Sequence, residues 1–427
     1  MVCEPVRGVS SAYGRVMPRS PSSPAFWRSP LRGPWFTSVL GVVLLVGITV
    51  LFVTGLVSYA AYNPDLSPVN DQTPDKGLLG FYLFSWPTHP SWLYRLTQGV
   101  HVTLGIALIP VLLAKLWSVV PKLFALPPAR SLAHALERLS LLLLVGGGLF
   151  EFTTGVLNVQ LDYIFPGSFY PLHFYGAWVF FAAFLAHAVL KTPLALRNLR
   201  HLRDEQPSGE GELVSPNPAE PTVSRRGALG VVGGGSLLLL ATTAGRSFDG
   251  PLRETAVLAP HGGPEPGGGP GGFQINKTAA YAGISPTETG EEAWRLVVTG
   301  RDGRSVRLDR PQLLQLALHS SALPIACVEG WSTSDQWWRG VRLRDLAALV
   351  GHDDPVDVLV ESLQRHGAFR RAALRANQVA DPRSLLALFV NGEDLTPDHG
   401  YPARVIVPAA PGVLNTKWVA RMTFGDL

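Results

Sequence analysis

Two histidines, His173 and His187, lie fourteen residues apart in a stretch of the sequence that contains no charged residue. In an α-helix this spacing comes within about 40° of whole turns and advances the chain by about 21 Å, so both rings lie on one face. Ionisable side chains inside a membrane helix are costly and are therefore candidates for function. Imidazoles near both sides of a bilayer suit two stacked haems, which would carry electrons across the membrane.

A haem held by two histidines needs a partner for each of these residues. His101 lies toward the outer side of another uncharged stretch, so it can face His173 as the second axial ligand. For His187 the best placed partner is His134, and His201 is the alternative. Hydrogen bonding between helices without haem is the competing interpretation of these histidines.

The second candidate centre is a lone thiol. The chain has two cysteines, Cys3 and Cys327, which is too few for a disulfide-stapled fold or a zinc ribbon. We expect them on opposite sides of a membrane, so they cannot pair with each other. A lone cysteine is most often a small buried apolar side chain, but its thiolate also suits a soft-ligand metal site.

The elements that must position these residues are long and apolar. Five stretches with no charge, or with Glu151 alone, cover 33–64, 96–114, 139–161, 163–190 and 227–245. Because about 20 apolar residues cross a bilayer as a helix, we expect a bundle of four transmembrane helices and a fifth anchor helix. Glu151 either pairs with a polar neighbour or carries protons near a quinone. The charged fraction of 16% and the mean hydropathy of +0.19 agree with a membrane protein.

Lys and Arg are concentrated before the first stretch, between the second and third, and after the fourth. This distribution predicts a cytoplasmic N-terminus in a multi-pass plasma-membrane protein. The fifth helix then carries the chain out, so that everything from about Arg246 is extracytoplasmic. The net charge of +4 is too small to indicate nucleic-acid binding.

The expected domains follow the chain in order. They are a cytoplasmic segment (1–34), a four-helix membrane domain (35–198), a cytoplasmic linker (199–226), the anchor helix (227–245), a Gly/Pro linker (246–272) and a catalytic domain (273–427). In the last domain, WRLVVTG, VDVLVESL and ARVIVPA predict strands, and QLLQLAL, LRDLAALVG and PRSLLALFV predict helices. This alternation indicates a compact α+β domain.

A pair of arginines, Arg225 and Arg226, precedes the anchor helix. The surrounding SRRGAL resembles a twin-arginine export signal, with Ala228 at the position usually held by Phe. The alternative is an ordinary positive flank of a membrane helix. Export of a folded domain would suit a cofactor that is loaded in the cytoplasm.

The histidine pattern resembles the cytochrome b subunits of formate dehydrogenase and hydrogenase over about Phe36 to Leu196. That resemblance implies haem b. The family commonly places its fourth histidine ligand on the first helix, and this chain has no histidine there, so we expect one or two haems per chain. A weak internal repeat places Thr54-Gly55 and Thr154-Gly155 in register. Small residues of this kind permit close approach of helices or of a flat macrocycle.

The segment LPIACVEGWS around Cys327, followed by Trp338-x-Gly340-x-x-Leu343, resembles the molybdenum-binding segment of the sulfite oxidase superfamily. The form is closest to the catalytic subunit of periplasmic protein-methionine-sulfoxide reductases. The resemblance implies that the thiolate of Cys327 binds molybdenum beside the two dithiolene sulfurs of molybdopterin.

A second block, DHGYPARV from Asp398 to Val405 with TKWV from Thr416, is similar to another pattern of the same superfamily. The resemblance implies that His399, Arg404 and Lys417 bind the pterin and its phosphate. An Arg fork and a Lys point charge suit a phosphate group.

These features predict a molybdopterin-dependent oxidoreductase of the EC 1.8 type that reduces small-molecule or protein S-oxides outside the membrane. Electrons would pass through haem b from a quinone or a cytoplasmic donor. The alternatives are a sulfite-type oxidase that delivers electrons to haem and quinone, and a haem electron-transfer protein with a non-catalytic outer domain.

The substrate preference rests on the residues that follow the ligand cysteine. Residues 329–337 contain no Lys or Arg to hold the sulfite dianion, although Arg339, Arg342 or Arg370 could do so. We expect an aromatic pocket for a neutral S-oxide or thioether instead, formed by Trp331, Trp337 and Trp338.

Overall fold

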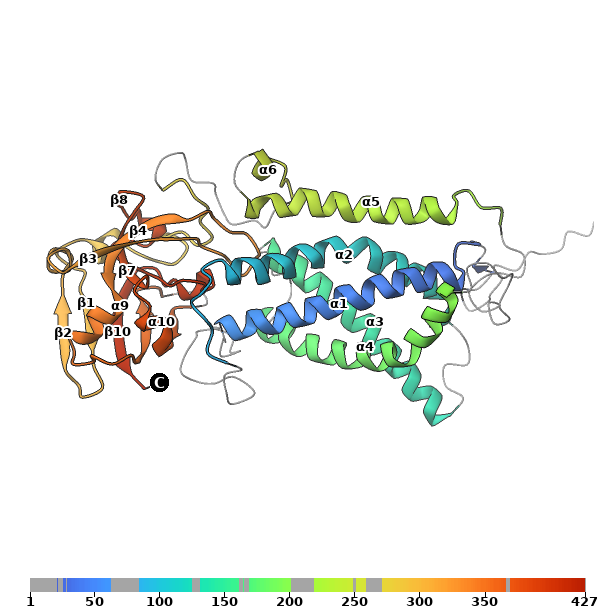
Figure 1. The fold of residues 1–427 in the computed structure, drawn as a ribbon, viewed down its shortest axis with the longest axis horizontal. Helices are drawn as coiled ribbons and strands as arrows, with labels where there is room; N and C mark the ends of the chain where they lie inside the picture. The colour runs from blue at the N-terminus through green and yellow to red at the C-terminus, as the bar shows by residue number, and fades with distance from the viewer. Residues whose placement is uncertain are drawn as a thin grey trace, which may run out of the picture.

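The computed structural model describes residues 21, 26–27, 29–62, 84–124, 131–160, 164, 169–200, 219–248, 251–258, 271–365 and 369–426. It consists of an elongated bundle of long helices with a mixed sheet domain at one end (Figure 1). The expected order, helices first and sheet domain second, is confirmed.

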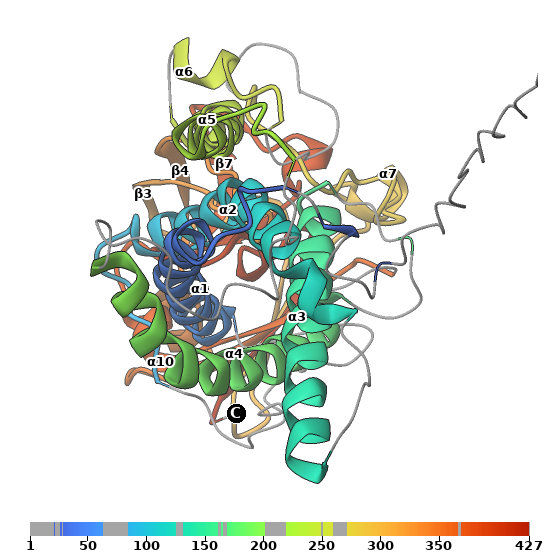
Figure 2. The ribbon, with the colours of Figure 1, turned by 90° about the vertical axis from the view of Figure 1, so that its right-hand side faces the viewer.

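Among the described residues, five helices are long and apolar enough to cross a membrane. They are α1 (Pro34–Tyr62), α2 (Leu93–Leu123), α3 (Leu132–Val159), α4 (Phe169–Arg200) and α5 (Arg225–Ala244). Viewed along the bundle, α5 lies outside the other four, next to α2 (Figure 2). Large apolar side chains such as Val46 and Val189 are more than 60% exposed on the bundle surface, as lipid contact requires. The helices are therefore candidate spans, and their place in a membrane stays a prediction.

The sheet domain is built from short elements. After η3 (Gly245–Ser247) and α6 (Pro251–Glu254), they are α7 (Pro286–Thr289), β1 (Leu296–Thr299), β2 (Ser305–Leu308), α8 (Arg310–Leu314), β3 (Leu318–Leu323), β4 (Gln336–Arg342), α9 (Leu343–Ala348), β5 (Asp357–Ser362), β6 (Arg371–Leu374), α10 (Ala376–Ala380), β7 (Leu385–Val390), β8 (Glu393–Asp394), η4 (Pro397–His399), β9 (Arg404–Ile406), η5 (Gly412–Leu414) and β10 (Val419–Gly425).

Two five-stranded sheets form this domain. One has the order β2-β1-β10-β5-β6, and the other has the order β3-β4-β7-β8 with β9 paired to β7. Strands β1 and β10 are parallel, and the other pairs are antiparallel. The main apolar core takes buried residues from both sheets and from α9, including Leu346, Val360 and Leu386.

The three strands expected from periodicity are present as β1, β5 and β9, whereas one of the three expected helices is a strand and another is only partly helical. PRSLLALFV forms strand β7, and QLLQLAL is divided between the end of α8 at Leu314 and the start of β3 at Leu318. Residues Leu385–Leu388 are all buried, so β7 shows no alternation of apolar and polar residues. A short apolar run that is buried on both faces cannot be distinguished from a helix by periodicity alone. LRDLAALVG does contain the expected helix, α9.

The segment that enters α2 attaches the bundle to the sheet domain. Trp86 Nε1 donates a hydrogen bond to the Ala409 carbonyl at 2.7 Å, and Asn377 Nδ2 donates to the Trp86 carbonyl at 2.8 Å. Arg383 Nη2 donates to the Thr88 carbonyl at 3.0 Å. These contacts fix the N-terminal end of α2 against the domain that contains Cys327.

Candidate functional site

Cys327 lies in a tight loop between β3 and β4. Its backbone N–H donates to the Trp331 carbonyl at 2.9 Å, and the Gly330 N–H donates to the Cys327 carbonyl at 3.1 Å. Gly330 has a φ of +92°, a left-handed conformation that glycine adopts without steric cost. The loop therefore holds the thiol in a fixed position, where Cys327 is 7% exposed.

Asn276 contacts the thiol directly, although no pattern in the sequence pointed to it. Its Nδ2 lies 2.8 Å from Cys327 Sγ and donates to Glu329 Oε2 at 2.6 Å. Burial, followed by the neighbouring Glu329 carboxyl group, raises the pKa of the Cys327 thiol. A bound metal ion reverses this preference because it stabilises the thiolate.

The second motif block lies beside this loop. His399 Nε2 donates to the Gly271 carbonyl at 2.7 Å, and its ring stacks on Phe273 with centroids 3.9 Å apart. Arg404 donates to the His399 carbonyl at 3.0 Å. Lys417 Nζ donates to the Lys277 carbonyl at 2.6 Å. All three predicted pterin ligands are thus within one hydrogen-bonded group.

Residues 271–277 join the two motif blocks. Gly271 and Phe273 contact His399, Asn276 contacts Cys327, and Lys277 contacts Lys417. Most of this segment is polar or small, and the sequence offered no reason to place it at the site. The structure therefore connects Cys327 to His399 and Lys417 through a strap of seven residues, and Arg404 joins this group through its hydrogen bond to the His399 carbonyl.

Arg404 and Lys417 are buried beside the strap, and neither forms a salt bridge with another described residue. Burial lowers the pKa of Arg404 to about 9, and burial together with Arg404 lowers the pKa of Lys417 well below its usual range. Buried charges require a partner, because desolvation is otherwise costly. An anionic group such as a phosphate would supply that partner.

Buried polar atoms beside these cations also have no partner among the described residues. They are Arg404 Nε, Asn415 Nδ2 and Thr416 Oγ1. Such atoms are rare in native proteins and call for an explanation. A bound polar heterocycle with a phosphate, which is the chemistry of molybdopterin, would satisfy them, so the residues present fit this cofactor.

The expected pocket of three tryptophans is wrong. Trp337 and Trp338 are neighbours in strand β4 and therefore point to opposite faces of the sheet. Trp338 is fully buried, whereas Trp337 is 58% exposed. Trp338 instead lies under Arg404, whose guanidinium carbon is 5.2 Å from the ring centroid. Arg339 lies on the same exposed face as Trp337, near Phe389.

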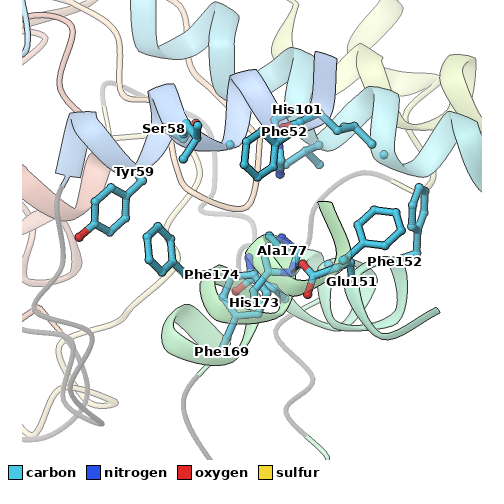
Figure 3. Close-up of a pocket in the computed structure, with 18 of the residues that line it drawn as sticks. Phe52, Ser58, Tyr59, His101, Glu151, Phe152, Phe169, His173, Phe174 and Ala177 are labelled. Carbon is cyan, nitrogen blue, oxygen red and sulfur yellow. Dashed lines mark hydrogen bonds and ion pairs between the residues drawn. The ribbon is translucent and has the colours of Figure 1, made fainter. Parts of the chain in front are cut away.

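The bundle contains a second candidate centre, which places His101 and His173 side by side (Figure 3). Their ring centroids are 6.4 Å apart and the ring planes are nearly perpendicular, at 87°. His101 Nδ1 donates to the Leu51 carbonyl at 3.0 Å and lies 3.1 Å from Thr54 Oγ1. Nε2 is therefore the nitrogen available to a metal.

His173, on α4, is held in the same manner by residues of α3. Its Nδ1 lies 3.0 Å from Thr154 Oγ1 and 3.0 Å from Glu151 Oε2. The Thr-Gly repeat thus has a structural meaning, because each threonine contacts one of the two histidines. A Cβ on Gly55 would lie 3.1 Å from His101 Cε1, so the glycine leaves room for the ring.

The two rings face a large, mainly apolar cavity. It contains about 1320 Å³ of empty space, including its open mouth, and is lined by α1, α2, α3, α4 and Val328. Because a metal–imidazole bond is about 2 Å long, and a ring nitrogen lies roughly 1 Å from the ring centre, one metal between two rings separates their centres by roughly 6 Å. The observed spacing and the cavity therefore fit a haem between His101 and His173.

The other predicted haem ligands, His187 and His134, are not part of this cavity. His187 lies on α4 about 21 Å along the helix from His173, and neither His187 nor His134 lines the cavity. His134 is in the first turn of α3, where its N–H donates to Ser131 Oγ. His201 and Cys3 lie outside the described residues. A second haem stays a prediction.

Residues 282–426 match the family model of the oxidoreductase molybdopterin binding domain. Mouse mitochondrial sulfite oxidase is 31% identical over 156 residues, which cover 30% of this chain and 29% of that protein. The uncharacterized oxidoreductase YuiH of Bacillus subtilis is 30% identical over 131 residues, covering 31% and 65%. The protein-methionine-sulfoxide reductase catalytic subunit MsrP of Gluconobacter oxydans is 31% identical over 151 residues, covering 31% and 47%.

Among solved structures, the sulfane dehydrogenase SoxCD of Paracoccus pantotrophus matches 32% of this chain and 39% of its own, with 22% identity and a TM-score of 0.29. The chain thus spans between 29% and 65% of the length of the three curated relatives named above. Residues 282–426 are therefore similar to a molybdopterin-binding oxidoreductase domain. This sulfite-oxidase-like part of the chain follows a helical region with five candidate spans among the described residues.

Proposed function

We propose that the protein is a membrane-anchored, molybdopterin-dependent oxidoreductase that reduces S-oxides outside the membrane with electrons relayed through haem b. The observation that carries this proposal is the convergence of Cys327, His399 and Lys417 on one strap of seven residues, with Arg404 bonded to the His399 carbonyl. The match of residues 282–426 to the molybdopterin binding domain supports the cofactor.

When bound, the molybdenum cofactor supplies two-electron oxygen-atom transfer. Cys327 would hold the metal, and Asn276 keeps the sulfur in place through the 2.8 Å contact to Sγ. Arg404 and Lys417 would neutralise the phosphate, and His399, whose ring stacks on Phe273, would help to hold the pterin. Because the loop and the second block are both buried, these residues also exclude water from the cofactor.

The preferred substrate is inferred from the cysteine loop, where residues 329–337 contain no Lys or Arg. The ionisable group beside Cys327 in that loop is the carboxyl of Glu329, which is 6% exposed. Such a group offers no attraction to the sulfite dianion, whereas it tolerates a neutral S-oxide. The relatives include both sulfite oxidases and a protein-methionine-sulfoxide reductase, so sulfite oxidation is the second candidate.

Haem b would supply one-electron transfer when it is bound between His101 and His173. Thr54 and Thr154 orient the two rings, and Glu151 holds the Nδ1 side of His173. A quinone in the membrane is the proposed electron donor. The twin arginine at the start of α5 would export the loaded domain and leave α5 as its anchor.

The test is a metal analysis followed by stopped-flow spectroscopy on the purified full chain in detergent. We expect stoichiometric molybdenum and haem, and we expect S-oxides such as methionine sulfoxide to oxidise the dithionite-reduced haem. If sulfite reduces the oxidised haem and S-oxides have no effect, the protein is a sulfite-type oxidase. Protein that is fully folded but lacks molybdenum would contradict the enzyme assignment.

A further inference from the structure

The cavity that contains His101 and His173 reaches the loop of the proposed molybdenum ligand. Val328 is the residue of the sheet domain among those that line the cavity, and it is bonded to Cys327. Val328 is 4% exposed and belongs to the same apolar cluster as Cys327, Trp86 and Tyr94. One residue of the chain thus separates the cavity of the bundle from the thiol.

Gln98 fixes this contact. Its Nε2 donates a hydrogen bond to the Val328 carbonyl, and its Oε1 accepts one from Ser58 Oγ at 2.6 Å. Gln98 lies three residues before His101 on α2, so the two side chains share one face of the helix. Gln98 is 7% exposed and also lines the cavity. A buried polar side chain therefore bridges the histidine helix and the cysteine loop.

A second contact brings the backbones together. A Cβ on Gly330 would lie 2.6 Å from Val102 Cβ, so α2 and the cysteine loop approach as closely as a glycine permits. The Gly330 carbonyl also accepts a hydrogen bond from Ser247 Oγ at 3.3 Å, and Arg95 donates to the Ser247 carbonyl. The loop is thus held against α2 from both sides.

We propose that this contact is the electron-transfer junction of the protein, with Gln98 and Val328 as its positioning residues. The inference rests on the proposed function, and it adds that transfer is intramolecular and needs no soluble carrier. For each S-oxide, two electrons cross the junction one at a time. The S-oxide takes up two electrons and two protons and gives a thioether and water. A quinol supplies the two electrons, releases two protons and becomes a quinone.

The test measures transfer across the junction separately from chemistry at the substrate. The full chain with both cofactors is reduced with dithionite and mixed with methionine sulfoxide, and oxidation of the haem is followed by stopped-flow absorption. In Gln98→Leu we expect this rate to fall several-fold, because the hydrogen bond that holds the Val328 carbonyl against α2 is lost. Val328→Ala should slow it in the same direction.

Thr97→Ala is the matched control, because Thr97 precedes Gln98 on α2 and its hydroxyl donates to the Tyr94 carbonyl within the same helix. This variant should oxidise its haem at the wild-type rate. Reduced benzyl viologen delivers electrons to molybdenum without the haem. In Gln98→Leu, the rate of methionine-sulfoxide reduction driven by this donor should therefore fall far less than the rate of haem oxidation. Electron paramagnetic resonance provides a readout without turnover, as the relaxation of the molybdenum signal by oxidised haem should weaken in Gln98→Leu.

The outcomes separate the junction from the function on which it depends. If Gln98→Leu and Val328→Ala both retain haem and molybdenum and oxidise their haem at the wild-type rate, the junction lies elsewhere and the inference is wrong. If the wild-type protein binds no haem, or if no S-oxide oxidises its reduced haem, the proposed function fails and the inference fails with it.

Discussion

Val102 of α2 lies directly against Gly330 of the cysteine loop, because a Cβ on the glycine would be 2.6 Å from the valine Cβ. The same glycine has a φ of +92°. Any side chain at this position therefore meets both backbone strain and a steric clash. The closeness of these two residues ties the position of the histidine helix to the position of Cys327.

Gly330→Ala should destabilise the protein and slow oxidation of the haem by an S-oxide. Left-handed backbone costs about 1–2 kcal/mol in a residue with a Cβ, and an overpacked contact costs about 1–3 kcal/mol more. Thermal unfolding and stopped-flow absorption measure the two effects. Gly303→Ala is the matched control, since Gly303 has a φ of +80° but no atom within 4 Å of its Cβ position. Equal losses of thermal stability and of haem oxidation rate in the two variants would show that the contact with Val102 contributes to neither.

The paired histidines give the second prediction. His101→Ala and His173→Ala should each remove the same component of the haem absorption spectrum, because one haem needs both imidazoles. Spectra of the reduced proteins, with haem content measured as the pyridine complex, provide the check. His187→Ala should leave this component in place, because His187 does not line the cavity. Loss of different components in His101→Ala and His173→Ala would contradict the pairing.

Sequence patterns predicted much of this arrangement because its causes are local. Uncharged stretches define the five helices, and the depth of His101 and His173 along their helices led to the expectation that they face each other. The structure places their rings 6.4 Å apart, while their role as ligands stays a prediction. Motifs around Cys327 and His399 likewise indicated the molybdopterin domain without any knowledge of its fold.

The contacts that connect these parts could not be predicted, because they join segments far apart in the chain. Asn276 reaches Cys327 across 51 residues, and Gln98 reaches Val328 across 230. Neither residue belongs to a periodic pattern or a motif, so its partner is visible only in three dimensions. Strand β7 was missed for a related reason, since burial on both faces removes the alternation that marks a strand.

Glu151 should tune the haem, because its Oε2 lies 3.0 Å from the Nδ1 of His173. A carboxyl group that accepts a hydrogen bond from the Nδ1 of an axial imidazole makes that imidazole a stronger donor and so favours oxidised iron, and Glu151→Gln should therefore raise the reduction potential. We expect a rise on the order of 60 mV, which corresponds to about tenfold in equilibrium for one electron. Redox titration followed by absorption measures it.

The control for this prediction is Thr54→Val, which removes a neutral hydroxyl from His101 and keeps the side-chain shape. Its effect on the potential should be much smaller than that of Glu151→Gln. An unchanged or lower potential in Glu151→Gln would indicate that the carboxyl group does not influence the haem. Retention of the normal haem content in both variants is required for the comparison.

Cys327→Ser should abolish S-oxide reduction while the haem spectrum stays intact. Serine lacks the soft, polarisable sulfur that suits a high-valent metal, and the rest of the loop is held by backbone hydrogen bonds that remain. Turnover with reduced viologen and the absorption spectrum are measured on the same preparation. Cys3→Ser should behave as the wild type. Activity that survives in Cys327→Ser would show that the thiol is not the metal ligand.

His399 predicts how stability depends on pH. Burial, opposed only in part by the hydrogen bond to the Gly271 carbonyl, lowers the pKa of His399 to about 4. Between about pH 6.5 and pH 4 the unfolded chain therefore binds a proton that the folded domain does not, so folding loses stability as pH falls. With 1.36 kcal/mol for each pKa unit, the loss of folding stability reaches up to about 3 kcal/mol at pH 4.

His399→Gln should have a flatter pH dependence of thermal unfolding across this range, and His319→Gln, on the partly exposed strand β3, is the comparison. A slope in His399→Gln equal to that of the wild type would mean that other groups cause the acid sensitivity.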